Sequence, residues 1–355
     1  MEASPVRLLD ERLIIPAGYR PYLDIRETEK AIKFIKDQFQ DALAAELNLQ
    51  RVSAPVAVLS GTGINDTLTG SENPVSFRIK SSGQQAEIVQ SLAKWKRKAL
   101  KEYGFISGEG IYTDMNAIRC DEMALDNLHS IYVDQWDWER IIADSERRLD
   151  VLQYVVRKIY SVIYRTEQVV CRKYHQLPGH RLPENIFFIH SEELEAMFPD
   201  LPARERENRI CQAKQAVFII GIGYPLTDGQ PHDFRAADYD DWSTPTEGKY
   251  HGLNGDILVW NPQLQTAFEL SSMGIRVNAE ALRIQLHLQS EDEKTALDFH
   301  QKVLRDHFPQ SIGGGIGQSR LCMFFLRKAH IGEIQAGIWD SETKRLCHQY
   351  GIPLL

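Results

Sequence analysis

The chain has 355 residues, with 41 lysines and arginines against 49 aspartates and glutamates, and therefore a formal net charge of −8. Hydrophobic residues make up 43% and charged residues 25%, which excludes a disordered, collagen-like or disulfide-scaffold protein. The acidic balance argues against a protein whose main task is to grip nucleic-acid phosphates, because that task needs a basic face. At roughly 150 residues per domain, length alone predicts about two domains.

Hydropathy and cysteine usage indicate a cytoplasmic protein. The sequence has no apolar run of the roughly 20 residues that span a bilayer, and its first residues do not resemble a signal peptide. The five cysteines are odd in number and include no C-x-x-C pair, which favours reduced thiols and gives no zinc site.

The first predicted element is a helix. Asp24 and Glu27 form a plausible capping box, and apolar residues follow at helical spacing as far as Leu47. A strand is expected over residues 52–59, where Pro55 favours an edge or an interface position.

The remaining strands are separated in some places by hairpin turns and in others by long helices. Further strands are expected at residues 75–79, 110–119, 130–140, 184–190, 216–223, 256–260 and 266–272. Further helices are expected at residues 91–103, 146–174, 279–289, 291–306 and 321–326, the last after a glycine-rich turn at 313–317. Because strands and helices do not alternate strictly, the pattern predicts an α+β fold with a mainly antiparallel sheet flanked by helices.

The glycine-rich turn is the first candidate for chemistry. Its backbone N–H groups and the helix that it opens could face an anion. It matches neither a P-loop nor a dinucleotide fingerprint, and a tight packing turn explains it equally well. Arg320 is its informative member, because a fixed guanidinium suits a phosphate.

The strand predicted over 130–140 suggests a polar ligand. In the strand over 130–140, Gln135, Asp137 and Glu139 share one face and Trp136 and Trp138 share the other. A glutamine beside a carboxylate suits a ligand with an ammonium group, although for an isolated pair a solvated face is the better interpretation.

Asp256 and Glu269 lie on the two arms of a predicted hairpin. Facing carboxylates are unfavourable unless a cation lies between them, and beside ATP that cation would be Mg²⁺. Ser271 shares the face of Glu269 if the strand continues, and Arg276 follows. In the basic run over 94–98, most side chains are expected in solvent, with one lysine pointing into a site.

Together these pieces resemble the three motifs of class II aminoacyl-tRNA synthetase catalytic domains, in the same order. They are a long helix with a proline-bearing strand, an arginine followed by a loop between antiparallel strands, and G-G-G-I-G-x-x-R. The closer resemblance, over about residues 24–355, is to the ammonia-dependent asparagine synthetase (aspartate–ammonia ligase) family. It is carried by S-L-A-K-W-K-R, Y-V-D-Q-W-D-W-E-R, D-Y-D-D-W-S-T-P, G-L-N-G-D-I-L-V-W-N, F-E-L-S-S-M-G-I-R-V and I-G-G-G-I-G-Q-S-R-L.

The resemblance implies one catalytic domain over residues 24–355, preceded by an extension, residues 1–23, of unassigned role. It implies that L-aspartate and ATP form β-aspartyl-AMP and pyrophosphate, and that ammonia then gives L-asparagine and AMP. Mg²⁺ is implied with ATP. A homodimer is expected, with no nucleic-acid or membrane partner.

The resemblance also implies residue roles. Arg119 and Arg320 correspond to the arginines of the second and third motifs, which reach the ATP α-phosphate and the γ-phosphate end, and they are expected to be catalytic together with Asp66 and Asp240. The expected ligands of aspartate are Ser91, Lys96, Gln135, Asp137, Ser271 and Arg276. The expected ATP contacts are Arg119, Glu269, Gly315, Gly317 and Arg320, and the expected Mg²⁺ ligands are Asp256 and Glu269.

These roles fit the chemistry of adenylate formation. An in-line attack on the α-phosphorus needs positioning and positive charge, not a protein nucleophile. Lys96 and Arg276 can clamp the α-carboxylate of aspartate and Asp137 its ammonium, so that the β-carboxylate reacts. Asp66 or Asp240 is then the hypothetical group that attracts NH₄⁺ and accepts its proton.

Three other functions are compatible with parts of this pattern. A class II synthetase-like paralogue could bind ATP and an amino acid in a tRNA-related or regulatory role. A tRNA-charging enzyme needs an anticodon-binding domain, for which the chain has no spare residues, and a regulatory module would lack Arg119, Asp256, Glu269 or Arg320. A glutamine-dependent enzyme needs a glutaminase site, and no cysteine follows Met1 or lies in a G-x-C-x-G elbow. Direct use of glutamine by the same site stays open.

Overall fold

An eight-stranded sheet organises the computed structural model, which describes residues 5–9, 11–68, 72–121 and 125–355. Its strand order is β3-β7-β8-β13-β12-β11-β10-β9. The neighbours from β7 to β10 are antiparallel, whereas the edge pairs β3–β7 and β9–β10 are parallel. The predicted α+β fold with a mainly antiparallel sheet is confirmed.

The strands and helices have the following bounds. The large sheet contains β3 (Leu49–Arg51), β7 (Gly110–Ile118), β8 (Tyr132–Ile141), β9 (Phe187–His190), β10 (Ala216–Ile220), β11 (Asn254–Asn261), β12 (Thr266–Ile275) and β13 (Ser311–Gly317). Two small sheets contain β1 (Val6–Leu8) with β2 (Leu13–Ile15), and β4 (Ala57–Leu59) with β5 (Ser76–Arg78) and β6 (Gln85–Ile88). The α-helices are α1 (Ile25–Leu47), α2 (Ala93–Glu102), α3 (Leu149–Lys173), α4 (Ser191–Met197), α5 (Ala203–Lys214), α6 (Ala279–Leu288), α7 (Asp298–Leu304), α8 (Gln318–Phe325) and α9 (Ser341–Gln349). Three short 3₁₀ turns are η1 (Asp144–Glu146), η2 (Asp292–Ala296) and η3 (Ile331–Glu333).

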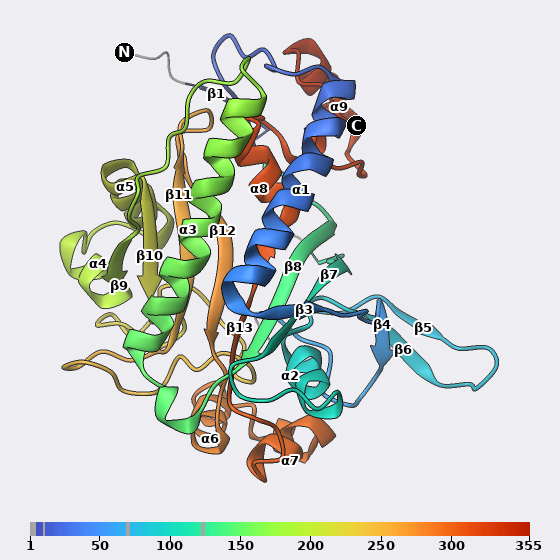
Figure 1. Ribbon diagram of the computed structural model, residues 1–355, viewed down its shortest axis with the longest axis vertical. Helices are drawn as coiled ribbons and strands as arrows, with labels where there is room; N and C mark the ends of the chain where they lie inside the picture. The colour runs from blue at the N-terminus through green and yellow to red at the C-terminus, as the bar shows by residue number, and fades with distance from the viewer. Residues whose placement is uncertain (1–4, 10, 69–71, 122–124) are drawn as a thin grey trace.

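Helices α1 and α3 lie side by side across one face of the large sheet (Figure 1). Phe39 of α1, Ile159 of α3 and Leu321 of α8 belong to the same buried cluster as Trp136 and Trp138 of β8. This apolar face fixes the register of β8, because a slip by one residue would turn the tryptophans away from the core. The alternating polar residues of β8 are therefore held on the opposite face.

The N-terminal segment packs against the C-terminal part of the chain. Leu13 and Ile15 of β2 are buried with Leu346 and Cys347 of α9. Asn127 fixes the same strand, because its side chain accepts a hydrogen bond from the backbone N–H of residue 14 and donates one to the carbonyl of that residue. Residues 1–4 and 10 of the predicted extension lie outside the described residues.

The N-cap of α1 was predicted correctly, but only the Asp24 half of the predicted capping box occurs among the described hydrogen bonds. Asp24 is its N-cap, and the Asp24 side chain accepts a hydrogen bond from the backbone N–H of Glu27 at 2.8 Å. None of the described helices is both long and apolar enough to cross a membrane.

The glycine-rich segment at 313–317 is not a turn, and that prediction is wrong. These residues belong to β13, which pairs with β12 on one side and β8 on the other, and α8 begins directly after the strand. Consecutive glycines are usual in turns, but a strand between two partners has its backbone hydrogen bonds satisfied without side chains.

Other boundaries also differ from the predictions. The strand expected over 52–59 exists only at its end, as β4, because Pro55 lies in the irregular link after β3. The helix expected over 291–306 is divided into η2 and α7. The strands expected over 184–190 and 216–223 are shorter, as β9 and β10, and Gly221 and Gly223 leave the sheet with positive φ values of 76° and 120°.

Candidate active site

Glycines of β13 make room for the polar side chains of β8. Gly317, Gly315 and Gly313 lie opposite Gln135, Asp137 and Glu139 in the antiparallel register. A Cβ atom on Gly315 would lie 2.4 Å from Gln135 Oε1 and 2.8 Å from Asp137 Oδ1, and one on Gly313 would lie 2.0 Å from Glu139 Oε2. The bare strand therefore provides the space into which these three side chains lean.

A cavity of about 230 Å³, here called the central cavity, opens above this pair of strands. Most of the predicted site residues line it: Ser91, Lys96, Arg119, Gln135, Asp137, Asp240, Glu269, Arg276 and Gly315. It thus brings together cationic and anionic side chains from α2, β7–β8, β12–β13 and the segment before β11.

A second cavity of about 90 Å³, here called the adjacent cavity, contains Gly317 and Arg320. The two cavities share Arg119, Gln135, Glu269 and Gly315, so they adjoin along β8 and β13. The site therefore consists of two adjoining cavities that share charged and polar walls.

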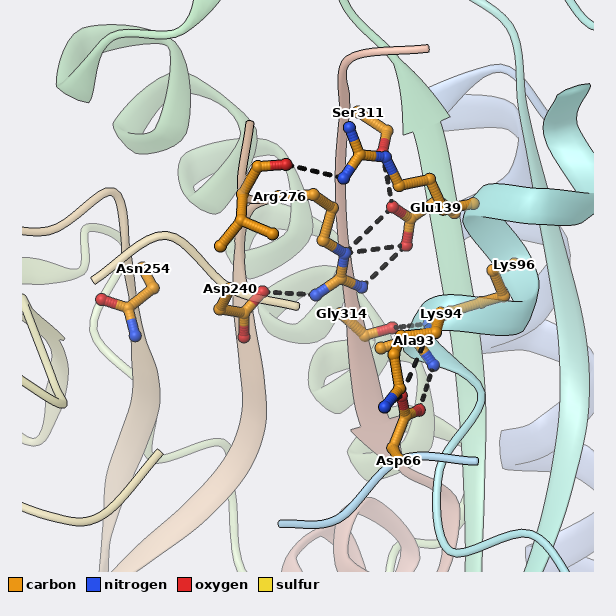
Figure 2. A network of polar contacts seen from close by, with 12 residues as sticks. Asp66, Ala93, Lys94, Lys96, Glu139, Asp240, Asn254, Arg276, Ser311 and Gly314 are labelled. Carbon is orange, nitrogen blue, oxygen red and sulfur yellow. Dashed lines mark hydrogen bonds and ion pairs between the residues drawn. The ribbon is translucent and has the colours of Figure 1, made fainter. Parts of the chain in front are cut away.

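Arg276 is clamped between two carboxylates at the wall of the central cavity (Figure 2). Its Nε donates to Glu139 Oε1 at 2.9 Å and its Nη2 donates to Glu139 Oε2 at 2.7 Å, while its Nη1 pairs with Asp240. Burial would raise the pKa of Glu139, but Arg276 outweighs it and lowers that pKa. Burial raises the pKa of Asp240. The guanidinium is thus held in one orientation beside the cavity.

Lys96 lies on the neighbouring wall. Its Nζ donates to the Gly314 carbonyl at 2.9 Å and lies 3.4 Å from Asp137 Oδ1, and Asp137 also accepts from the backbone N–H of Leu92 at 3.2 Å. Burial lowers the pKa of Lys96 despite the carboxylate. Lys96 and Asp137 therefore present opposite charges to the same cavity.

Asp66 is buried and does not line the central cavity. It accepts hydrogen bonds from the backbone N–H groups of Ala93 at 2.6 Å and Lys94 at 3.3 Å. The first turn of α2 has no side-chain cap of its own, so Asp66 supplies one from a distant segment. Burial raises the pKa of Asp66.

Asp256 and Glu269 are not cross-strand partners, so the predicted facing pair is wrong in its register. Asp256 lies opposite Ser272, and a β-bulge separates that pair from the pairing of Glu269 with Leu258. The bulge changes the alternation of β12, so that Ser272 and not Ser271 lines the central cavity with Glu269. Ser271 is buried and donates its hydroxyl to the Gly315 carbonyl at 2.9 Å.

Each of these two carboxylates has an arginine beside it. Arg235 pairs with Asp256, and Arg320 Nη1 lies 3.3 Å from Glu269 Oε2. Burial and the nearby Glu269 raise the pKa of Asp256 to about 7, although Arg235 opposes the shift. The two carboxylates therefore interact with each other as well as with their arginines.

The residues fit a divalent cation that arrives with a nucleotide. Asp256 Oδ1 is buried and has no hydrogen-bond partner among the described residues. The described part of the chain holds no cluster of three or more His, Cys, Asp or Glu side chains suited to a metal. Mg²⁺ is commonly held by one or two carboxylates together with substrate phosphates, which is the set that Asp256 and Glu269 offer.

Sequence reasoning missed several residues of the site. Arg235 and Tyr239 line the central cavity from the irregular segment before β11, where no periodicity marks them. Lys94 forms a buried cluster with Asp238 and His300 next to Asp66: Lys94 Nζ lies 2.8 Å from Asp238 Oδ2, which also lies 3.0 Å from His300 Nε2. Asp238 and Tyr239 belong to the D-Y-D-D-W-S-T-P motif, but within that motif only Asp240 was assigned a role.

Comparison with known proteins gives consistent matches. The sequence profile of the family described as aspartate-ammonia ligase matches residues 26–351. Proteins named aspartate–ammonia ligase from Bacteroides thetaiotaomicron and Parabacteroides distasonis are 54% and 55% identical over 344 residues, which is 97% of this chain and 99% of each relative. The protein of that name from Clostridium perfringens (strain ATCC 13124) is 55% identical over 346 residues, covering 97% of this chain and all of that protein.

Solved structures with a similar fold are tRNA synthetases. Asparaginyl-tRNA synthetase from Pyrococcus horikoshii, complexed with asparaginyl-adenylate, superposes with a TM-score of 0.66 at 16% identity over 89% of this chain and 71% of that one. Aspartyl-tRNA synthetase from Entamoeba histolytica gives a TM-score of 0.57 at 14% identity over 90% and 58%. At these identities the likeness establishes the class II synthetase fold alone, as the sequence predicted.

Proposed function

This chain belongs to the aspartate–ammonia ligase family, and from that membership we infer an ATP-dependent enzyme that joins ammonia to L-aspartate to give L-asparagine. The observation that supports a site for this reaction is the central cavity, which is lined by Lys96, Arg276 and Asp137. It adjoins a second cavity that contains Arg320. A tRNA-related or regulatory paralogue is not favoured, because the ligase relatives match over nearly the whole chain.

Aspartate binding follows from the charges of the central cavity. The α-carboxylate of aspartate is proposed to lie between Lys96 and Arg276, and its ammonium beside Asp137 and Gln135. Charge-assisted hydrogen bonds of this kind are roughly twice as strong as neutral ones and fix orientation. Such a pose directs the β-carboxylate toward Arg119, which lines both cavities.

Activation is proposed to be an in-line attack of the β-carboxylate oxygen on the α-phosphorus of ATP. The new bond gives β-aspartyl-AMP, and the α–β phosphoanhydride bond breaks to release pyrophosphate. Arg119 is proposed to stabilise charge on the α-phosphate, and Arg320 charge on the departing phosphates. Preorganised cations of this type stabilise the transition state without a covalent protein intermediate.

Mg²⁺ is proposed to be held by Asp256 and Glu269 with the nucleotide. When bound, it supplies positive charge that neutralises the phosphate oxygens during displacement. Asp256 and Glu269 would hold this cation between them, close to Arg235 and Arg320. Ser272 lies opposite Asp256 in the sheet and lines the central cavity, and it is proposed to contact the nucleotide phosphates.

The second step is the attack of ammonia on the β-carbonyl carbon, with AMP as leaving group. A carboxylate near this carbon would attract NH₄⁺ and accept its proton. Asp240 lines the central cavity and Asp66 lies under α2, so we assign the role to Asp240. D240N is expected to raise the KM for ammonia more than D66N does, and equal values for both variants and the wild type would contradict the assignment.

One assay tests the reaction. The protein is mixed with aspartate, ATP, Mg²⁺ and NH₄⁺, and the products are separated. Asparagine, AMP and pyrophosphate are expected in equal amounts. ADP in place of AMP would contradict the adenylate, and product with glutamine but not with NH₄⁺ would contradict ammonia as the nitrogen donor.

A homodimer in the cytoplasm is also proposed, with residues 24–355 as its single catalytic domain. Val56, Leu59 and Phe77, on and beside the projecting β4–β6 sheet, are 56%, 42% and 43% exposed, which is unusual for large apolar side chains close together on one small sheet. The sheet of β4, β5 and β6 projects away from the large sheet and its helices, beside α2 (Figure 1). Size-exclusion chromatography with light scattering should give twice the chain mass of 40.7 kDa.

A further inference from the structure

Arg235 pairs with the buried carboxylate of Asp256 and also lines the central cavity. Its Nη2 pairs with Asp256 Oδ2, and its Nη1 donates to Asp233 Oδ2 at 2.7 Å and to the Phe234 carbonyl at 2.9 Å. Arg235 lines the central cavity, whereas Asp256 is buried and does not line it. The guanidinium therefore screens the buried carboxylate from the cavity.

The backbone around Arg235 is fixed while its side chain faces the cavity. The Arg235 carbonyl accepts from Gln289 Nε2 at 2.6 Å, and the next N–H, of Ala236, donates to the Leu68 carbonyl at 3.1 Å. The side chain has 12% of its surface exposed, although the neighbouring Asp233 side chain is 61% exposed. A rotation of the side chain alone can thus uncover Asp256 without a change in the fold.

Arg235 contacts only one of the two carboxylate oxygens of Asp256. Asp256 Oδ1 remains buried without a hydrogen-bond partner among the described residues. The Arg235 guanidinium contacts one oxygen of Asp256 and is shared with the carboxylate of Asp233. A partner that bound both oxygens of Asp256 would be stronger. A divalent cation would satisfy the buried oxygen, and phosphate oxygens in the cavity would offer the displaced guanidinium a better partner.

We propose that Arg235 is an internal counter-cation that closes the Asp256 metal site until nucleotide phosphates arrive, and that it then exchanges Asp256 for those phosphates. The proposal rests on the assignment of Asp256 and Glu269 as metal ligands made above. Arg235 is then a nucleotide-binding residue, and its exchange makes metal and nucleotide binding cooperative. Bare Mg²⁺ competes with Arg235, whereas the nucleotide removes that competitor.

Metal binding can be measured without catalysis. Mn²⁺ replaces Mg²⁺, and free Mn²⁺ is followed by electron paramagnetic resonance with and without α,β-methylene-ATP, whose α–β bond is not cleaved. The wild type is expected to bind Mn²⁺ weakly alone and about tenfold or more tightly with the analogue, within the usual range of coupling between two ligands. R235Q should bind Mn²⁺ about tenfold more tightly than the wild type without nucleotide, and it should bind the analogue without metal about tenfold more weakly.

Controls separate this inference from the proposed metal ligands. R235K keeps a cation and should stay close to the wild type in metal affinity. R165Q removes an exposed arginine that pairs with Glu46 at 2.8 Å and should change neither affinity. The gain of R235Q should vanish in R235Q/D256N, and thermal unfolding identifies any variant that fails to fold.

Two failures have different meanings. If D256N and E269Q weaken Mn²⁺ binding in the presence of the analogue but R235Q leaves the affinity without nucleotide unchanged, Arg235 is a static ion pair and the exchange is overturned. If D256N and E269Q leave Mn²⁺ binding with the analogue unchanged, the metal-ligand assignment itself fails. R235K and D256N are both expected to fold, so either result is interpretable.

Discussion

Gly315 lies directly opposite Asp137 in the pairing of β13 with β8, and a Cβ atom at position 315 would come within 2.8 Å of the Asp137 carboxylate. It would come still closer, 2.4 Å, to Gln135 Oε1. The side chains proposed to hold the ammonium of aspartate therefore depend on the absence of a side chain on the neighbouring strand. The polar face of β8 and the glycines of β13 act as one structural unit.

This relationship predicts the effect of adding one methyl group. G315A should fold, but it should push Gln135 and Asp137 out of position and lower kcat/KM for aspartate by about 100-fold, as small misplacements of binding groups commonly do. G179A is the matched control, because a Cβ there meets no other atom within 4 Å and its φ is not positive. Steady-state kinetics with aspartate varied would test this, and a G315A enzyme with wild-type kinetics would contradict it.

The same pair of strands shows what sequence can and cannot predict. The alternation of Gln135 and Asp137 with buried tryptophans placed the polar face of β8 correctly, because side-chain direction in a strand follows from local geometry. The glycines opposite were assigned to a turn, since nothing local distinguishes a glycine-rich strand from a glycine-rich loop. The β-bulge, which makes Ser272 and not Ser271 line the central cavity, depends on how β11 pairs with β12. The position of Arg235 depends on the path of an irregular segment. Such long-range geometry has no periodic signal.

Replacement of Arg276 is expected to lower the stability of the fold strongly. It is 2% exposed and balances two buried carboxylates, Glu139 and Asp240. R276M should lower the free energy of unfolding by about 3–5 kcal/mol, because it leaves buried charges without a partner. R165M, at an exposed pair, should cost less than about 1 kcal/mol.

Urea unfolding of these variants gives the comparison. In R276M, the further change E139Q should restore part of the lost stability, since it removes one of the uncompensated charges. If R276M and R165M were equally stable, the clamp would not contribute as described. Activity of R276M should fall with stability and stay low when E139Q restores stability, because the guanidinium is also proposed to hold substrate.

The buried cluster of Lys94, Asp238 and His300 gives a third prediction. Although burial opposes it, Lys94 and His300 lower the pKa of Asp238. D238N should therefore lower the free energy of unfolding by about 3–5 kcal/mol, the usual cost of breaking a buried pair from one side. Because Lys94 lies in the first turn of α2, the change should also loosen the helix that carries Lys96.

Hydrogen exchange resolves the two effects of D238N. Faster exchange is expected in α2, at amide groups that are protected in the wild type, with other helices little changed. D298N is the control, because its carboxylate is 67% exposed and pairs only with Lys302 among the described residues. Uniform exchange changes over the whole chain would contradict a local role for the cluster.

The raised pKa of Asp256 is expected to make the stability of the fold depend on pH. Its pKa is raised to about 7 by burial and by Glu269, against an ordinary value of 3.8 in the unfolded chain. Between about pH 4 and pH 7 the folded chain therefore holds a proton that the unfolded chain has lost, so this group stabilises the fold at low pH and the stabilisation disappears as the pH rises. D256N cannot titrate at this position. Its stability relative to the wild type should therefore rise across this window by up to about 1.4 kcal/mol per pH unit, and then level off above pH 7.

Urea unfolding of both proteins from pH 4 to pH 8 measures the difference. Mg²⁺ with α,β-methylene-ATP should remove the pH dependence, because a bound cation favours the carboxylate, whereas a constant difference between the two proteins at every pH would contradict the raised pKa.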